Sequence, residues 1–429
     1  MKLLERLKYL LLIVVTSLFF FPFEFTFLPG MNTKMILAAL GLVVFIINMA
    51  VSRSATLDKD FFVSALFAAM VSLIGVVSVV YNSTNDTTYA SYIVSFAVWM
   101  GGAYFVVNCI KVAHGHIRPE LVINYLIAVC VAQCTLALLI DEYPQVKNLV
   151  DSFLAGEGFM GKAKGRLYGI GAALDVAGLK FSAVLILISF IAMKKKDMSR
   201  WLCVAYWSSF LYIAVVGNFI GRTTTIGLII ALLYTFCLLL SSFKRSNLKL
   251  RWRILPLLLV VALGVPILLL LYKTSPQVRE NIRFGFEGFF SLFETGRWET
   301  NSNNSLANMV IFPDNDKTWI IGDGYFNNPN NDINFVGSNP TEFYKGTDIG
   351  YLRFIFYFGI LGLLAFVSYM GVVCWRCIIR HRQYATAFLL LLMLNFLVWF
   401  KVSSDIFLVF ALFLCVPPEE DSLIQNGDV

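Results

Sequence analysis

The chain has 429 residues, of which 58% are hydrophobic and 14% are charged, whereas a soluble domain is usually about 45–50% apolar and about 25% charged. This composition excludes an ordinary soluble globular protein and indicates that lipid is the solvent. The formal net charge of +7 does not indicate nucleic-acid binding, because the basic residues concentrate in short loops between apolar blocks.

The apolar residues occur in blocks of about 17–25, the length that crosses a hydrocarbon core of about 30 Å. We therefore expect a single all-α polytopic membrane domain, residues 1–429, with about 12 transmembrane helices. The first block follows a basic start, but it lacks a small-residue cleavage site and is expected to be retained. The expected spans are 8–28, 35–51, 61–81, 90–110, 120–140, 172–193, 202–220, 223–242, 254–272, 349–374, 384–400 and 404–417.

More than half of the 34 Lys and Arg lie in short loops that fall on one side if the helices alternate in direction. Positive residues stay on the cytoplasmic side of a membrane protein. We therefore expect both termini in the cytoplasm. None of the eight Cys lies in an expected outer loop, so no disulfide framework is expected.

Two connections on the opposite side are long, 141–171 and 273–347. The second, between the ninth and tenth spans, far exceeds a typical connection. Amides pair with sugar hydroxyls and aromatic rings offer flat apolar faces, so its composition favours a sugar-binding surface, a folded cap with its own small core, or both. Its aromatic and amide residues are Trp298, Trp319, Phe326, Phe335, Phe343, Tyr344, Asn301, Asn303, Asn304, Asn327, Asn328, Asn330 and Asn331.

Charged residues inside or just outside the membrane are costly and therefore mark candidate functional positions. Most of them here are positive and face outward, against the usual distribution of charge. An anionic ligand would explain this, and the planar guanidinium of arginine suits phosphate oxygens. The candidates are Arg166, Lys180, Arg222, Asp348, Arg353, Lys401 and Asp405.

Each candidate also has a structural interpretation that the sequence leaves open. Arg222 could cap a helix end, and Lys180 could pair with a buried carboxylate. Lys401 could lie in a short outer turn, and Asp348 could be a helix N-cap.

The chain has no nucleotide-binding signature of the G-x-x-x-x-G-K-[ST] or G-x-G-x-x-G kind. Its three His, at 114, 116 and 381, are all expected in the cytoplasm. This excludes an outward-facing histidine zinc site and a histidine base there. We expect no cofactor, and any outer reaction would use donors already activated on a carrier.

Several segments resemble bacterial O-antigen or capsular polysaccharide polymerases of the Wzy type. The similarity covers about residues 160–370 and includes the large outer loop. Related O-antigen ligases carry an outer-loop histidine near the position of Thr347 and Asp348, which this chain lacks. The segments that carry the resemblance are Arg166–Gly178, Gly221–Thr224, Ile321–Phe326, Thr347–Arg353 and Phe358–Gly362.

The resemblance implies a GT-C-like membrane glycosyltransferase of the bacterial inner membrane, with the two long loops in the periplasm. It would join oligosaccharide repeat units carried on undecaprenyl diphosphate. Its partners would be these lipid-linked units, membrane lipid and a chain-length regulator protein, and no nucleic acid. Two alternatives remain open: an O-antigen ligase, weakened by the missing histidine, and a secondary transporter, which usually has internal repeats and short outer loops.

The expected residue roles follow from the charge that develops on the leaving diphosphate. Arg222, Arg166 and Arg353 are expected to stabilise that charge, with Lys180 and Lys401 as weaker candidates. Tyr351 is a further substrate-binding candidate in the same motif as Arg353. Asp348 is the first candidate for a base and Asp323 the second.

Overall fold

A computed structural model gives the fold of the chain and describes residues 2–52, 58–155, 166–195, 198–244 and 252–418. Part of the expected first outer loop (156–165) and the expected cytoplasmic tail (419–429) lie outside these ranges. Within them the protein is all-helical, with isolated β-bridges in place of strands.

The long helices are α1 (Lys2–Phe20), α2 (Thr33–Ser52), α3 (Lys59–Asn82), α4 (Tyr92–His114), α5 (Pro119–Glu142), α7 (Leu174–Lys194), α8 (Arg200–Ile220), α9 (Thr224–Lys244), α11 (Leu255–Thr274) and α16 (Gly350–Arg380). Shorter ones are α6 (Pro144–Phe153), α12 (Pro276–Gly285), α13 (Glu287–Thr295), α14 (Asn301–Ala307), α15 (Asp316–Ile320), α17 (Ala385–Val398) and α18 (Phe407–Cys415). Three 3₁₀ turns complete the set: η2 (Pro329–Asn331), η3 (Tyr344–Gly346) and η4 (Arg382–Tyr384).

Each of the twelve expected spans overlaps a helix, although the first was expected to reach residue 28 and α1 ends at Phe20. Among the described residues, nine helices are long and apolar enough to cross a membrane, so the chain is a multi-pass membrane protein by length and composition. The other three are α1, α17 and α18. The first starts with several charges, and the last two are shorter than a bilayer core requires.

Helix α7 is the centre of the bundle. Its residues from Ala177 to Met193 are all buried, because α5, α8, α9 and α17 pack around it. A helix that is apolar on all sides is stable only when other helices surround it. At the other extreme, no residue of α11 is buried, so α11 lies at the edge of the bundle with its leucines outward.

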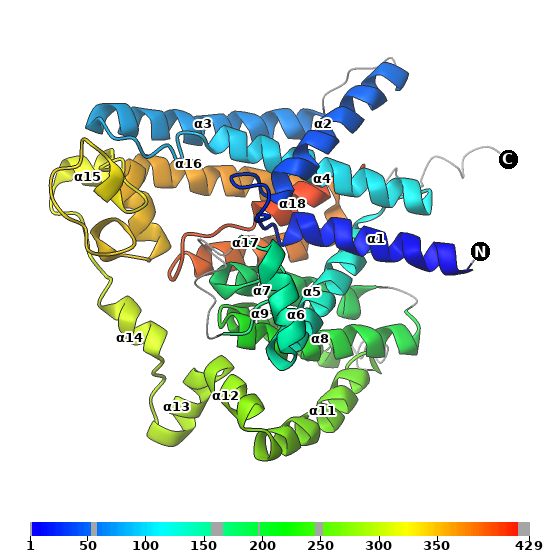
Figure 1. The fold of residues 1–429 in the computed structure, drawn as a ribbon. Helices are drawn as coiled ribbons and strands as arrows, with labels where there is room; N and C mark the ends of the chain where they lie inside the picture. Colours follow the sequence, from blue (N-terminus) through cyan, green and yellow to red (C-terminus); the bar gives the residue numbers. More distant parts are fainter. Residues whose placement is uncertain (1, 53–57, 156–165, 196–197, 245–251, 419–429) are drawn as a thin grey trace.

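The expected outer loop 273–347 contains four short helices. Figure 1 shows the chain running through α11, α12, α13 and α14 along the lower edge of the molecule before it reaches α15 at the left. Helix α12 packs on α8 and α11, whereas α15 packs on α16. This connection therefore packs on the bundle near both of its ends. We call the end of the bundle that carries α15 the outer end.

Helix α16 is broken at Phe358 and Gly359, and Gly359 has a φ of 68°. A break frees backbone carbonyls, which must find other donors at membrane depth. Here the amides of Asp323 and Gly324 donate to Phe356 O (2.6 Å) and Tyr357 O (3.0 Å). The hydroxyl of Ser78 on α3 also donates to Tyr357 O, at 2.6 Å. The 321–326 segment thus fills the break and joins the folded connection 273–347, which we call the outer cap, to the bundle.

Gly359→Ala is expected to destabilise the protein, because the new Cβ would lie 2.1 Å from Ile320 O and the φ of 68° belongs to glycine. The strain alone is about 1–3 kcal/mol. Gly371→Ala is the control, since its Cβ meets nothing within 4 Å on the same helix, and it should be neutral or stabilising. Thermal unfolding of both variants in detergent measures the difference. Equal unfolding temperatures would contradict this account of the break.

Candidate functional site

The turn between α8 and α9 is locked against the start of α7 by glycines. A Cβ on Gly221 would lie 2.3 Å from Leu174 O, and one on Gly178 would lie 2.9 Å from Gly221 O. Leu174 itself has a φ of 55°, an unfavourable conformation for a residue with a side chain. This close approach places Asp175 beside the turn that holds Arg222 and Thr223.

Asp175 joins three parts of the chain at this point. Its carboxylate accepts hydrogen bonds from Thr223 Oγ1 and from Lys401 Nζ, the latter at 2.6 Å. Lys401 Nζ also donates to Thr223 Oγ1, at 3.2 Å. The first turn of α7, the α8–α9 turn and the segment after α17 therefore share one polar cluster.

Arg222 extends the cluster to the outer helices. Its Nη1 pairs with the carboxylate of Glu287, at the start of α13. Its guanidinium carbon lies 4.7 Å from the centre of the Phe284 ring, and that of Arg166 lies 5.2 Å from the same ring. Arg166 also attracts Asp175 electrostatically.

We call this cluster the arginine site. It brings together three of the expected ligand-binding cations with two carboxylates and a hydroxyl. Its members are Arg166, Arg222, Lys401, Asp175, Glu287 and Thr223.

Arg353 has a different environment. Its guanidinium carbon lies between two rings, 3.7 Å from the centre of Phe326 and 4.2 Å from that of Phe343. Its terminal nitrogens donate to Phe326 O and to Ser403 Oγ, both at 3.0 Å. With both faces covered and the side chain 7% exposed, Arg353 ties the outer cap to the segment after α17 and offers little to a ligand.

Asp348 lies 3.5 Å from Arg353 Nη1 and is 28% exposed. The N-cap interpretation of Asp348 is wrong, because α16 begins after Ile349, which has no side-chain cap. Asp348 is connected to Lys401 through Arg353 and Ser403. Lys401 and Ser403 are two residues apart in the chain, so their Cα atoms are separated by at most about 7 Å. The segment 401–403 thus links Asp348 to the arginine site.

Asp323 is enclosed in a separate network. One oxygen accepts from Lys317 Nζ (2.6 Å) and Thr318 Oγ1 (2.7 Å), and the other accepts from Tyr344 OH (3.2 Å). Burial, and after it the charge of Asp323, raises the pKa of the Tyr344 phenol well above its ordinary value, so that the phenol stays protonated and donates. Asp323 therefore stabilises the outer cap.

Two other expected residues point away from the arginine site. Lys180 lies about 140° around α7 from Asp175 at 100° per residue, and its Nζ lies 5.1 Å from the ring centre of Phe21 at the end of α1. Tyr351 donates its hydroxyl to Phe396 O at 3.0 Å. The first is thus packed against α1 and the second against α17.

Sequence reasoning did not select Asp175, Thr223 or Glu287. A carboxylate in the first turn of a helix looks like an ordinary helix-start residue, so Asp175 and Glu287 gave no distinctive signal. The spacing of small and polar residues along α7 was informative, however. Asp175, Gly178 and Ser182 lie on one side of α7, and this side faces the α8–α9 turn.

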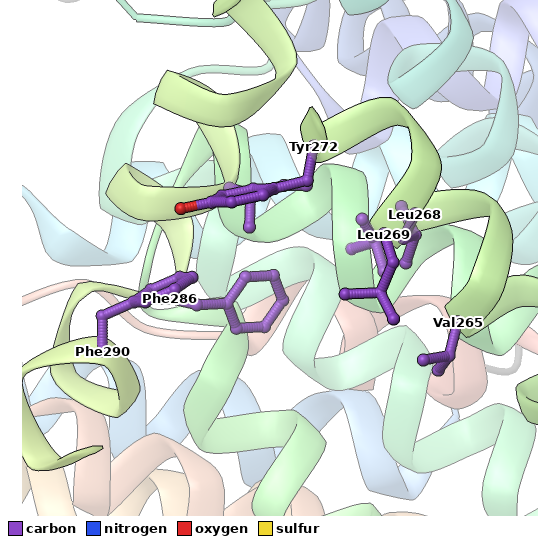
Figure 2. A pocket seen from close by; sticks show the side chains of 8 residues that line it. Val265, Leu268, Leu269, Tyr272, Phe286 and Phe290 are labelled. Atoms are coloured by element: carbon purple, nitrogen blue, oxygen red, sulfur yellow. The ribbon is translucent and has the colours of Figure 1, made fainter. Parts of the chain in front are cut away.

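An apolar pocket of about 220 Å³ adjoins the arginine site. Figure 2 shows Tyr272, Phe286 and Phe290 around one part of it and the α11 side chains Val265, Leu268 and Leu269 around another. Val215 of α8 and Ile282 of α12 complete the lining. Phe286 directly precedes Glu287, so the pocket and the cationic cluster lie on two sides of one corner of the chain.

No group of three or more His, Cys, Asp and Glu side chains in the described part of the chain could hold a metal ion. The three His lie at the other end of the bundle, at the end of α4 and just after α16. His114 Nε2 bonds Tyr125 OH at 2.8 Å, and His381 Nε2 bonds Phe413 O at 3.0 Å.

No protein-family model, curated protein or solved structure matches the chain.

Lys401→Met is expected to lower the unfolding temperature, because it leaves the partly buried carboxylate of Asp175 without its charged partner. The cost is about 1–3 kcal/mol. Adding Asp175→Asn should recover part of this loss, because the uncompensated charge is then gone. Thermal unfolding of the two single variants and the double variant measures the coupling. Strictly additive effects would mean that the pair does not hold these segments together.

Proposed function

We propose that this chain is a membrane glycosyltransferase that polymerises oligosaccharide repeat units carried on a polyprenyl diphosphate. The observation that supports it best is the meeting of Arg166, Arg222 and Lys401 at the outer end of the bundle. All three come from segments far apart in the sequence, and two of them belong to the segments that carry the polymerase resemblance.

The proposed orientation puts the arginine site in the periplasm of a bacterial inner membrane and both termini in the cytoplasm. It is supported by the basic residues at the opposite end of the bundle, where Arg376 and Arg380 lie close to the start of α3. Of the other three helices, α1 would cross the membrane despite its charged start, while the short α17 and α18 would form a broken pair.

In the proposed reaction, a sugar hydroxyl of the incoming lipid-linked unit attacks the anomeric carbon of the growing chain. The new glycosidic C–O bond forms as the bond from that carbon to the diphosphate breaks. The electron pair leaves with the polyprenyl diphosphate, and the hydroxyl proton passes to a base. The donor carries its own activation, so the chain's task is to stabilise the charge that develops on the diphosphate.

The cations divide this task by geometry. Arg222 and Arg166 present guanidinium groups that fit phosphate oxygens in pairs. Lys401, fixed by Asp175 and Thr223, supplies a point charge from the other side. Asp348 is the proposed base, since it is partly exposed and is connected to Lys401 through Arg353 and Ser403. Arg353 then orients Asp348 and the 401–403 segment.

The isoprenoid chain of the donor would lie in the apolar pocket beside Phe286. The pocket walls are entirely apolar, and one wall belongs to the lipid-exposed helix α11. Phe286, which lines the pocket, directly precedes Glu287 of the arginine site. A long isoprenoid chain joined to a diphosphate needs this combination of an apolar groove open to lipid with cations at its mouth.

Arg222→Ala is expected to abolish the polymer while the protein stays at its normal level in the membrane. Arg222→Lys should restore only part of it, because an ammonium cannot make the paired contact. The assay is gel separation of the surface glycan from a deletion strain complemented with each variant. The ladder should collapse to single repeat units with Arg222→Ala. Arg297→Ala, which removes an exposed arginine just after α13, is the control and should leave the ladder intact.

A full ladder from well-expressed Arg222→Ala protein would refute the proposed role. If the deletion itself leaves polymer stranded on the carrier lipid, the chain is a ligase. If it removes even the single units from the surface, the chain is a transporter.

Filling the pocket should weaken donor use without touching the cations. Leu268→Trp is expected to raise the KM for lipid-linked donor by roughly tenfold, as for a loss of about 1.4 kcal/mol of binding. Leu263→Trp, on the same helix but 62% exposed and outside the pocket, is the matched control. Initial rates on lipid-linked repeat units in proteoliposomes give both values. Equal KM values would place the isoprenoid chain elsewhere.

A further inference from the structure

Glu287 occupies the position in the arginine site that an anionic ligand would need. We propose that Glu287 is a resident anion that the donor diphosphate displaces from Arg222, and that its return helps expel the diphosphate product. This inference rests on the proposed function, because it assumes that a diphosphate is what Arg222 receives.

The geometry makes Glu287 a substitute for a phosphate oxygen. One of its oxygens pairs with Arg222 Nη1, and the guanidinium also lies over the Phe284 ring. Arg222 is 15% exposed and Glu287 is 27% exposed, so the pair is only partly screened by water. A ligand that binds Arg222 through Nη1 must therefore replace this carboxylate.

Glu287 has a second attachment that keeps it nearby when it leaves Arg222. Its other oxygen accepts a hydrogen bond of 3.1 Å from the backbone N–H of Asn301, the first residue of α14. Gly285 and Gly288 hold the same corner by close packing, the first on Phe219 of α8 and the second on Trp298. The carboxylate can thus exchange partners by a side-chain rotation, without release of α12 and α13.

The charges at the site favour this exchange. The arginine site contains three cations and two carboxylates, which leaves a net charge of +1. Without Glu287 it has a net charge of +2, which matches a lipid-linked diphosphate diester of about −2. Asp175 does not exchange in this way, because Lys401 and Thr223 both hold it.

The same competition acts on the product. When the glycosidic bond breaks, the diphosphate becomes a monoester with a charge of up to about −3. A site with only cations would retain it. Glu287, still attached to Asn301, competes for Arg222 and weakens that grip. Glu287 therefore lowers affinity for both donor and product, in favour of turnover.

The test is binding of inorganic pyrophosphate and of farnesyl diphosphate to the purified full chain in detergent. Glu287→Gln keeps the shape and removes the charge, so it should tighten binding by roughly three- to tenfold. Glu287→Asp is a milder change, with a shorter carboxylate, and should tighten it less. Glu294→Gln is the matched control, because Glu294 lies on the same helix as Glu287 and its ion pair with Arg283 of α12 is exposed, and it should change nothing.

Unchanged or weaker binding with Glu287→Gln, while Arg222→Ala weakens it, would overturn the role of Glu287 and leave the proposed function intact. In that case Glu287 only holds Arg222 in place. If Arg222→Ala binds both probes as tightly as the wild-type chain, Arg222 is not a diphosphate ligand, and both the exchange and the proposed function of the site fail.

Discussion

The carboxylate of Asp175 is the contact on which the outer end of this bundle depends. It lies at the start of the most buried helix and receives Lys401 from the segment after α17 and Thr223 from the α8–α9 turn. Glycine packing holds the α8–α9 turn to α7, and this carboxylate adds the segment after α17 at membrane depth, where polar groups must find partners within the protein. Since Arg222 precedes Thr223 directly, the position of the arginine follows from this contact.

A second constraint places the outer cap. The break in α16 leaves carbonyls that the 321–326 segment and Ser78 satisfy, and glycines at 322 and 359 permit the close approach. Arg353, four residues from Tyr357, then holds the cap through Phe326 and reaches Ser403. The five segments of the resemblance thus form two interlocked groups, and the 401–403 segment joins them. Irregular backbone is tolerated here because it is buried in protein.

Much of the fold was predictable, because a helix that crosses lipid must be long and apolar, and such segments are directly visible in the sequence. Arg166, Arg222 and Lys401 could also be selected as candidates, since positive charge on the expected outer side contradicts the usual distribution. The sequence did not separate these from Arg353 and Lys180, because charge alone does not say whether aromatic rings enclose a cation. It also missed Asp175 and Glu287, whose partners come from distant segments, and the helices inside 273–347, whose apolar faces are short.

The central claim is that this chain, unaided, joins lipid-linked units by releasing polyprenyl diphosphate. The most direct measurement is reconstitution of the purified chain in liposomes with polyprenyl-diphosphate-linked repeat units as the single added substrate. The account predicts a ladder of lipid-linked oligomers, with one polyprenyl diphosphate released for each new glycosidic bond. Repeat units that cross the bilayer or stay unchanged, without oligomers and without released polyprenyl diphosphate, would contradict it.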